Sequence, residues 1–163
     1  MYFRFLHPPE GARATGWSEN DASCVLQIRY RDTVILLPGD IERRAEQALV
    51  AALRLSRVAL VIAPHHGSRT SSGPSFVAAV DPDYVVFTVQ ARGRWQLPHE
   101  TVVRRWAQTG ACLLSTAETG ALVFELSVDG ELKLVRRWRQ HASGLWSAAD
   151  QQTGLPCPAS PVI

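Results

Sequence analysis

The order of apolar and polar positions along this chain separates strands from helices. Residues 23–30 alternate between the two kinds, which predicts a half-buried strand. Residues 33–37, 57–63 and 83–89 are continuous apolar runs, typical of strands that are covered on both faces. Further strands are predicted over 2–6, 111–116, 121–128 and 131–138. An Asp-Gly turn sequence separates the last two runs and predicts that they form a hairpin.

Three helices are predicted, over 41–55, 74–80 and 99–110. The first has apolar residues at three- and four-residue spacing, the second has Pro74 in its first turn, and the third ends at Gly110. The first of them joins the apolar runs 33–37 and 57–63, so these two strands should be parallel. The other helices also alternate with strands along the chain. The pattern therefore predicts a mixed α/β fold that consists of a hairpin, two or three βα units and a closing hairpin.

The same pattern predicts a sheet with one uncovered face. Crossovers of one hand place their helices on a single face of a sheet, whereas these strands are apolar on both faces. A large exposed apolar face usually marks an interface. We therefore expect the chain to self-associate, or to gather its N-terminal and C-terminal hairpins over that face.

The composition is that of an ordinary globular domain. The chain has 163 residues, of which 46% are hydrophobic and 20% charged, and its net charge of +2 gives only a weak bulk attraction to nucleic acid. The basic residues are 16 Arg and one Lys, and Arg suits bidentate phosphate contacts. No apolar run approaches the roughly 20 residues of a membrane helix, and the first residues lack the pattern of a signal peptide.

The three cysteines do not predict a disulfide scaffold or a cysteine metal site. Their number is odd and no C-x-x-C occurs. Cys24 and Cys112 lie in apolar, strand-like segments, where a free cysteine behaves as a small hydrophobic side chain. Cys157 lies in the C-terminal segment, which is expected to be loosely ordered.

Polar side chains with catalytic potential follow two neighbouring predicted strands. LLPGD ends at Asp40, and APHHGSRTSS carries His65 and His66. Because the carboxyl ends of parallel strands meet at one edge of a sheet, we expect Asp40 and the histidine pair to form one cluster. Neighbouring side chains of an extended segment point apart, so one histidine should face a metal ion while the other serves a second role.

Each of these residues also has a purely structural interpretation. Asp40 could cap the helix that begins at Ile41, and the histidines could be loop residues that bond to backbone. Gly67 allows close approach of a ligand, and the hydroxyl groups after it precede a helix start, where phosphate binds readily. Turn and capping chemistry explains these hydroxyl groups equally well. They belong to Ser68, Thr70, Ser71 and Ser72.

The number of candidate ligands is too small for a complete metal centre. A zinc site takes three or four ligands of the His, Cys or Asp type. Asp40, one histidine of the pair and His99 at the start of the third helix give three at most. No H-x-H or H-x-D-x-D-H sequence occurs, so a two-metal centre for phosphodiester hydrolysis would lack most of its ligands.

Several segments resemble the C-terminal end of ComEC-type DNA-internalisation proteins. They are FLHPP, LLPGDIERRAEQAL and VIAPHHGSRTSSGPSFVAAVDPDYVVFT, with smaller blocks at 20–23, 115–116, 120–121 and 136–138. The resemblance covers about residues 2–146. It implies a metallo-β-lactamase-like αββα sandwich, of which residues 1–146 form mainly the C-terminal half. Residues 147–163 are expected to be a flexible tail.

The resemblance implies a part in DNA uptake, or competence. Complete members are inner-membrane proteins that carry one DNA strand across, and their metallo-β-lactamase-like domain is thought to hydrolyse the non-transported strand. The parent protein is thus expected in the bacterial inner membrane, with this domain soluble and on the periplasmic side. The expected partners are single-stranded DNA, the N-terminal half of the same domain and the membrane-channel part of the parent protein.

By position, the resemblance assigns catalytic and metal-binding roles to Asp40, His65 and His66, and a metal-binding role to His99. The intact domain would be a metal-dependent nuclease that uses zinc or manganese. The isolated chain should be inactive and hold metal weakly or not at all, because metal affinity depends on the number and geometry of the ligands. Substrate contacts are expected from Ser68, Thr70, Ser71, Arg92 and Arg94.

Two departures from the family pattern weaken the metal site. The H-x-D-x-D-H motif would precede residue 1. The loop that usually reads G-x-R-N-R-x-G-H-P-H reads QARGRWQLPH at 90–99. Gly93 thus stands at the Asn position and Leu97 at the first His position. Because Leu97 cannot bind a metal ion, the site would be incomplete even in the parent protein.

Two other functions compete with that of a nuclease. One is a non-catalytic DNA-binding or scaffolding domain, whose side chains contact phosphates and stack on the bases of single-stranded DNA. The side chains concerned are Arg92, Arg94, Trp95, Arg104, Arg105 and Trp106. Their alternative role is a solvated helix face with tryptophan packed inward. The second competing function is hydrolysis of a small molecule on the same fold.

Overall fold

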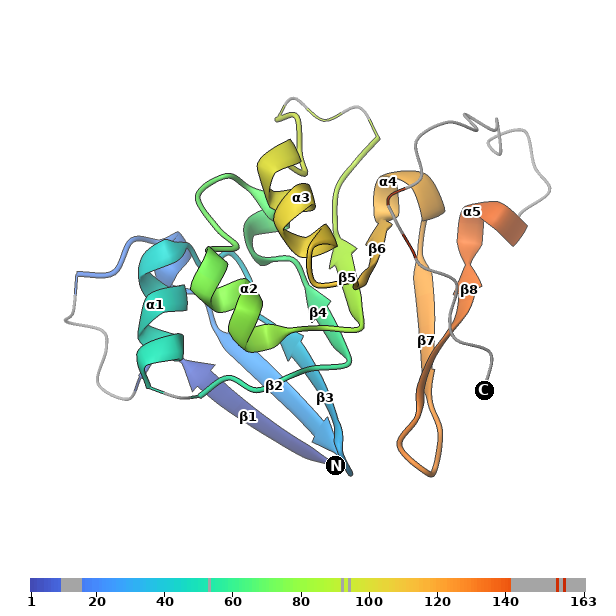
Figure 1. The fold of residues 1–163 in the computed structure, drawn as a ribbon, viewed down its shortest axis with the longest axis horizontal. Helices are drawn as coiled ribbons and strands as arrows, with labels where there is room; N and C mark the ends of the chain where they lie inside the picture. The colour runs from blue at the N-terminus through green and yellow to red at the C-terminus, as the bar shows by residue number, and fades with distance from the viewer. Residues whose placement is uncertain are drawn as a thin grey trace.

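A six-stranded sheet forms the centre of the molecule (Figure 1). The computed structural model describes residues 1–9, 16–52, 54–91, 93, 95–141, 155 and 157. β1 to β3 pair antiparallel and β3 to β6 pair parallel, which confirms the predicted mixed α/β fold. The strands lie in chain order as β1 (Tyr2–His7), β2 (Val25–Tyr30), β3 (Thr33–Leu37), β4 (Leu60–Ile62), β5 (Tyr84–Phe87) and β6 (Cys112–Ser115).

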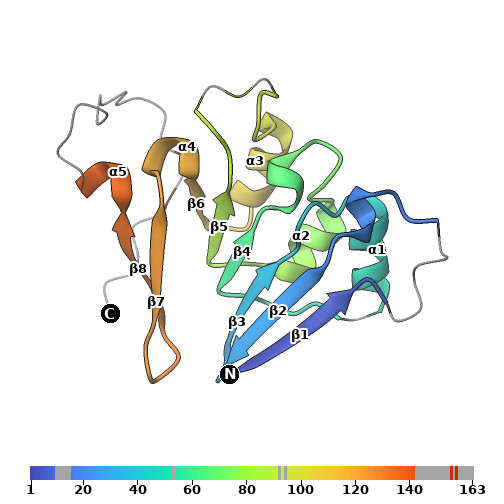
Figure 2. The same cartoon turned by 180° about the vertical axis from the view of Figure 1, so that it is seen from behind.

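Three helices cover one face of this sheet, as the two opposite views in Figures 1 and 2 show. They are α1 (Arg43–Ala51), α2 (Pro74–Val80) and α3 (Glu100–Ala107). The core between them and the sheet includes Leu36, Leu49, Phe76 and Trp106, each at most 1% exposed. Burial of an aliphatic or aromatic side chain contributes about 1.5–3 kcal/mol, so these contacts are a main source of stability.

Short helical segments connect several of these elements. They are η2 (Asn20–Ala22), η3 (Pro64–Gly67), α4 (Thr116–Thr119) and α5 (Trp138–His141). η2 and η3 are single 3-10 turns, and neither is indicated by the hydrophobic pattern. In the part of the chain that the structure describes, no helix has the length and apolar character needed to cross a membrane.

A two-stranded sheet covers part of the opposite face. β7 (Leu122–Leu126) and β8 (Leu132–Arg137) pair antiparallel and pack on β4 to β6. Phe124 meets the ring of Tyr84 edge-on, with ring centroids 5.3 Å apart. The C-terminal hairpin therefore gathers over the sheet as expected, whereas the predicted N-terminal hairpin forms β2 and β3 of the sheet itself. The cluster beneath it consists of Leu60, Val86, Cys112 and Leu114.

The part of that face formed by β1 to β3 remains open, apart from Ile35 of β3, which packs against the cluster beneath the hairpin. Phe3 and Phe5 of the edge strand are 63% and 68% exposed. Phe3 lies opposite Ile28 of β2, and Phe5 lies opposite Leu26. Their neighbours on β3 are also apolar, so two apolar rows run across three strands. The uncovered apolar surface expected from the sequence is thus present on one half of the sheet.

The N-terminus of α1 corrects a sequence-based expectation. The hydrophobic pattern predicts a helix over 41–55 that Asp40 caps, but α1 is shorter at both ends. Asp21 provides the cap instead, since its Oδ1 accepts hydrogen bonds from the backbone nitrogens of Glu42 (2.7 Å) and Ala45 (3.3 Å). Asp21 belongs to η2 and is buried, at 5% exposed. The expectation is wrong because a distant turn delivers this carboxylate.

The cysteines also differ from expectation. Cys112 and Cys157 form a disulfide, which links β6 to the C-terminal segment across a sequence separation of 45 residues. Cys24 is free and exposed. Apart from Leu155 and Cys157, the predicted tail 147–163 lies outside the described residues.

Candidate functional site

The carboxyl ends of β3 and β4 bring Asp40 and His66 together. Asp40 Oδ1 lies 3.6 Å from His66 Nε2, and the two side chains are 46% and 45% exposed. The backbone nitrogen of His65 donates a hydrogen bond to the carbonyl of Gly39 (3.1 Å), which ties the two strand ends to each other. The expected position of these residues is confirmed, and their catalytic and metal-binding roles remain predictions.

The two neighbouring histidines have different partners. His65 Nδ1 lies 3.3 Å from Glu42 Oε1 and 3.4 Å from Thr70 Oγ1, whereas His66 faces Asp40. Both histidines have positive φ angles, 47° and 56°, so the chain turns tightly within η3. The side chains therefore diverge as expected, but a left-handed turn causes this rather than the alternation of an extended strand.

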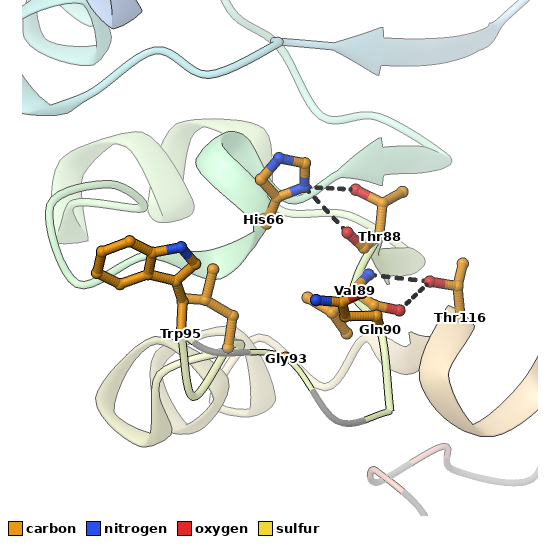
Figure 3. A pocket seen from close by; sticks show the side chains of 8 residues that line it. His66, Thr88, Val89, Gln90, Gly93, Trp95 and Thr116 are labelled. Atoms are coloured by element: carbon orange, nitrogen blue, oxygen red, sulfur yellow. Dashed lines mark hydrogen bonds between the residues drawn. The ribbon is translucent and has the colours of Figure 1, made fainter.

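Thr88 sets the orientation of the His66 ring. His66 Nδ1 lies 2.9 Å from the carbonyl oxygen of Thr88 and 3.0 Å from its Oγ1 (Figure 3). A carbonyl oxygen only accepts hydrogen bonds, so Nδ1 carries the hydrogen and donates it. In neutral His66 the free lone pair is then on Nε2, the nitrogen nearest Asp40. Metal-binding histidines commonly have this arrangement, with the second ring nitrogen bonded to a carbonyl.

Asp40 and His66 fit a metal ion by type but are too few to hold one. A carboxylate oxygen and an imidazole nitrogen both bind zinc or manganese, but two ligands do not make a site. His99 caps α3, since its Nδ1 accepts a hydrogen bond from the backbone nitrogen of Thr101 (3.3 Å), and its metal-binding role remains a prediction. Among the described residues, no three His, Cys, Asp or Glu side chains are grouped to hold a metal ion.

The hydroxyl groups that follow the histidines bond to other protein groups. Ser71 is fully buried, and its Oγ donates a hydrogen bond to the carbonyl of Pro64 (2.8 Å). Thr70 Oγ1 donates to Glu42 Oε1 (2.7 Å) and lies 3.1 Å from Ser68 Oγ. Contact of Ser71 with substrate would require this loop to open, whereas Thr70 and Ser68 lie nearer the surface. The substrate roles of all three remain predictions.

A buried glutamate, Glu46 of α1, holds the end of the same loop. It is 1% exposed, and its carboxylate accepts hydrogen bonds from the backbone nitrogens of Gly73 (2.7 Å) and Ser72. Burial raises the pKa of Glu46 to about 7, although these hydrogen bonds and the charges of Arg43 and Arg105 act in the opposite direction. A carboxylate of the protein thus occupies the start of α2, where the sequence suggests a phosphate.

A cavity of about 470 Å³ opens beside His66 (Figure 3). Leu97, at the position where the resemblance expects a histidine, is part of its lining. Arg92 and Arg94, for which substrate contacts are predicted, lie outside the described residues. The cavity is lined by His66, Thr88, Val89, Gln90, Trp95 and Leu97, among others.

The aromatic residue of α3 packs into the core, whereas its basic residues bond to other protein groups. Trp106 is fully buried, and its Nε1 donates a hydrogen bond to Ser72 Oγ (3.1 Å). Arg105 donates to the carbonyl of Ser72, and Arg104 pairs with Glu100 one helical turn away. Trp106 thus packs inward, as the alternative interpretation expects, and contacts of Arg104 and Arg105 with DNA remain predictions.

Sequence comparison relates this α/β domain to bacterial competence proteins of the ComEC type. The chain is 35% identical over 130 residues to the competence protein ComA of Neisseria gonorrhoeae. It is 29% identical over 120 residues to recombination protein 2 of Haemophilus influenzae, and 24% identical over 107 residues to ComE operon protein 3 of Bacillus subtilis. No family model matches the chain.

These matches cover most of this chain and a small part of each relative. They take in 78%, 74% and 66% of the chain, but only 18%, 15% and 14% of the three relatives. The chain is therefore homologous to one region of ComEC-type competence proteins, as its sequence segments indicate. What those proteins do as a whole applies to this chain only as a proposal.

Proposed function

We propose that this chain is the DNA-handling part of a DNA-uptake protein, in which Asp40 and His66 contribute to a metal centre that hydrolyses the non-transported strand. The observation that carries the proposal is the His66 ring, which Thr88 orients so that the lone pair of Nε2 faces Asp40. The competence proteins among its relatives support the DNA-uptake part of the proposal.

The proposal includes a metallo-β-lactamase-like sandwich, with the N-terminal half of the same domain supplying the second sheet and the remaining ligands. The helices on one face of the sheet and the open apolar surface of β1 to β3 on the other support this arrangement. The parent would be an inner-membrane protein, with this domain on the periplasmic side next to its membrane-channel part.

In such a centre two residues of this chain would be metal ligands, and neighbouring groups would orient them. His66 would present Nε2 while its Nδ1 donates to the Thr88 carbonyl, and Asp40 would add a carboxylate oxygen. Zinc or manganese, when bound, supplies an activated water and polarises the phosphodiester. The hydrogen bond that His66 donates to Thr88 keeps the ring from rotating away, and loss of such a partner typically lowers metal affinity or activity about 10- to 100-fold.

Cleavage of single-stranded DNA by the domain extended upstream into its parent protein tests this function. With Mn²⁺, we expect Asp40→Asn and His66→Ala to lower the cleavage rate at least roughly tenfold. Asp32→Asn is the matched control, because Asp32 is exposed in the turn at the opposite end of β3. The isolated chain should not cleave DNA, since it lacks most of the ligands.

Two results would contradict the proposal. Undiminished cleavage by His66→Ala in the extended domain would show that this edge is not the metal centre. Chelator-sensitive cleavage by the isolated chain would show that the ligands present are sufficient. His65→Ala decides which histidine of the pair is used, because His65 contacts Glu42 rather than Asp40.

A second candidate function, non-catalytic DNA binding, is favoured by one observation. Leu97 lines the cavity at the position where the resemblance expects a metal-binding histidine. A domain of this kind would bind single-stranded DNA without cleaving it, even when extended and supplied with Mn²⁺. Its affinity for DNA would then be the same in the His66→Ala variant as in the wild type.

A further inference from the structure

We propose that the cavity beside His66 binds one nucleobase of single-stranded DNA, stacked against the indole of Trp95. This inference rests on the proposed DNA-handling function and specifies which part of the substrate the site recognises. The cavity volume of about 470 Å³ is within the range of roughly 300–1,000 Å³ that is usual for small-molecule sites. It is therefore large enough for a base and part of its sugar.

The walls of the cavity suit a flat, mostly apolar ring. Trp95 is 71% exposed, and Val89 and Leu97 add aliphatic surface. Figure 3 shows the Trp95 indole on one side of the cavity and the backbone at Val89 and Gln90 on the other, with His66 at the rim. Aromatic side chains stack on any base, because every base has a π face.

The polar groups of the cavity match the edge of a base better than a phosphate. The side-chain amide of Gln90 offers a donor and an acceptor, and it makes no hydrogen bond to the residues that the structure describes. No Lys or Arg is among the described residues that line the cavity, so these walls offer no cation to a phosphate. The base therefore belongs in the cavity and the phosphodiester outside it.

The wall at Val89 is preformed. Thr116 Oγ1 accepts a hydrogen bond from the backbone nitrogen of Val89 (2.9 Å) and donates one to its carbonyl (2.8 Å). These two bonds fix the chain where β5 leaves the sheet, next to Thr88, which orients His66. A base held in the cavity would place its phosphodiester at the edge where Asp40 and His66 lie, so the cavity and that edge form one continuous surface.

Binding of a labelled oligothymidylate, compared with an abasic oligomer of the same length, tests the inference. The two probes have equal numbers of phosphates, so only the bases differ. The wild-type chain should bind the oligothymidylate more tightly. Trp95→Ala should weaken that binding by roughly 5- to 100-fold and leave the abasic oligomer unaffected, while Trp95→Phe restores the preference. Trp138→Ala is the matched control, because Trp138 is also exposed (53%) but lies on α5.

The outcomes separate this inference from the proposed function. Equal binding of both oligomers by the wild type would overturn the base site and leave a DNA-handling role intact. An equal loss of both probes in Trp95→Ala would also overturn it, with circular dichroism reporting whether that variant is folded. Binding of neither oligomer by the wild type would overturn the base site and the DNA-handling role together.

Discussion

Glu46 is a carboxylate in an unusual environment, buried between α1 and the loop that leads into α2. Its pKa of about 7, compared with the ordinary 4.5, means that the folded protein binds this proton more tightly than the unfolded chain does. The unfolded state therefore binds fewer protons between these two values. It follows that stability is highest below pH 4.5 as far as this group is concerned, and falls as pH rises to about 7.

Substitution of Glu46 should remove this pH dependence. We expect the free energy of unfolding of the wild type to decrease, between about pH 4.5 and about pH 7, by an amount on the order of 3 kcal/mol from this group. Glu46→Gln should lack that contribution, because an amide does not titrate. Urea denaturation at a series of pH values measures both slopes. Glu125→Gln, at an exposed position on β7, serves as the control and should keep the wild-type slope.

A parallel pH profile of Glu46→Gln and the wild type would contradict this assignment. The sequence itself contains a signal for this residue, because Glu46 lies directly next to Ala45 on the apolar side of the predicted helix 41–55. A charged side chain at such a position needs buried partners. Those partners, Ser72 and Gly73, lie 26 and 27 residues away, so the hydrophobic pattern cannot identify them.

The proximity of Asp40 and His66 could be predicted from the sequence for a different reason. Parallel strands bring their carboxyl ends to one edge, so the position of each residue after its apolar run is sufficient to place it. The individual hydrogen bonds are not accessible in this way. The contact of His66 with Thr88 and the position of Leu97 in the cavity wall depend on two loops that meet only in the folded protein.

At the scale of elements, the long apolar runs predict where the strands lie but do not predict the residues at which elements begin and end. β4 spans three residues within the predicted 57–63, and the backbone nitrogen of Val58 bonds to the carbonyl of Val80 in α2 rather than to a strand. η3 replaces an expected extended segment after β4. Gly67 ends this turn at a position with no room for a side chain, since a Cβ there would lie 2.7 Å from the Phe87 ring.

The cap of α1 gives a test at this scale. Asp21→Ala should lower the free energy of unfolding by about 1–2 kcal/mol, because the backbone nitrogens of Glu42 and Ala45 lose their acceptor near the helix start. Asp40→Ala is the matched control and should change stability by much less, since Asp40 caps nothing. Urea denaturation of the two variants measures the difference. An equal loss in both would mean that Asp40 does contribute to the helix start.

At the scale of the whole molecule, the two faces of the sheet are covered by different elements and to different extents. Three helices pack on one face, while the β7–β8 hairpin covers mainly the region over β4 to β6 on the other. The hairpin tip reaches the turn between β2 and β3, where Tyr30 Oη donates a hydrogen bond to the carbonyl of Val128 (3.1 Å). Beyond it, the rows that contain Phe3 and Phe5 continue the same apolar surface.

We expect the isolated chain to self-associate through this open surface. The β7–β8 hairpin already packs on one part of this face of the six-stranded sheet. A second copy that places its own β1 to β3 face on the open part would extend this sheet-on-sheet packing. Phe3→Lys combined with Phe5→Lys should weaken association at least roughly tenfold, because burial of each Phe contributes about 1.5–3 kcal/mol and about 1.4 kcal/mol corresponds to a factor of ten. Val135→Lys is the control, since Val135 is also exposed (42%) but lies on β8. Sedimentation velocity at several concentrations measures the effect. A wild-type chain that stays monomeric throughout and binds no apolar dye would show that these two rows need no partner.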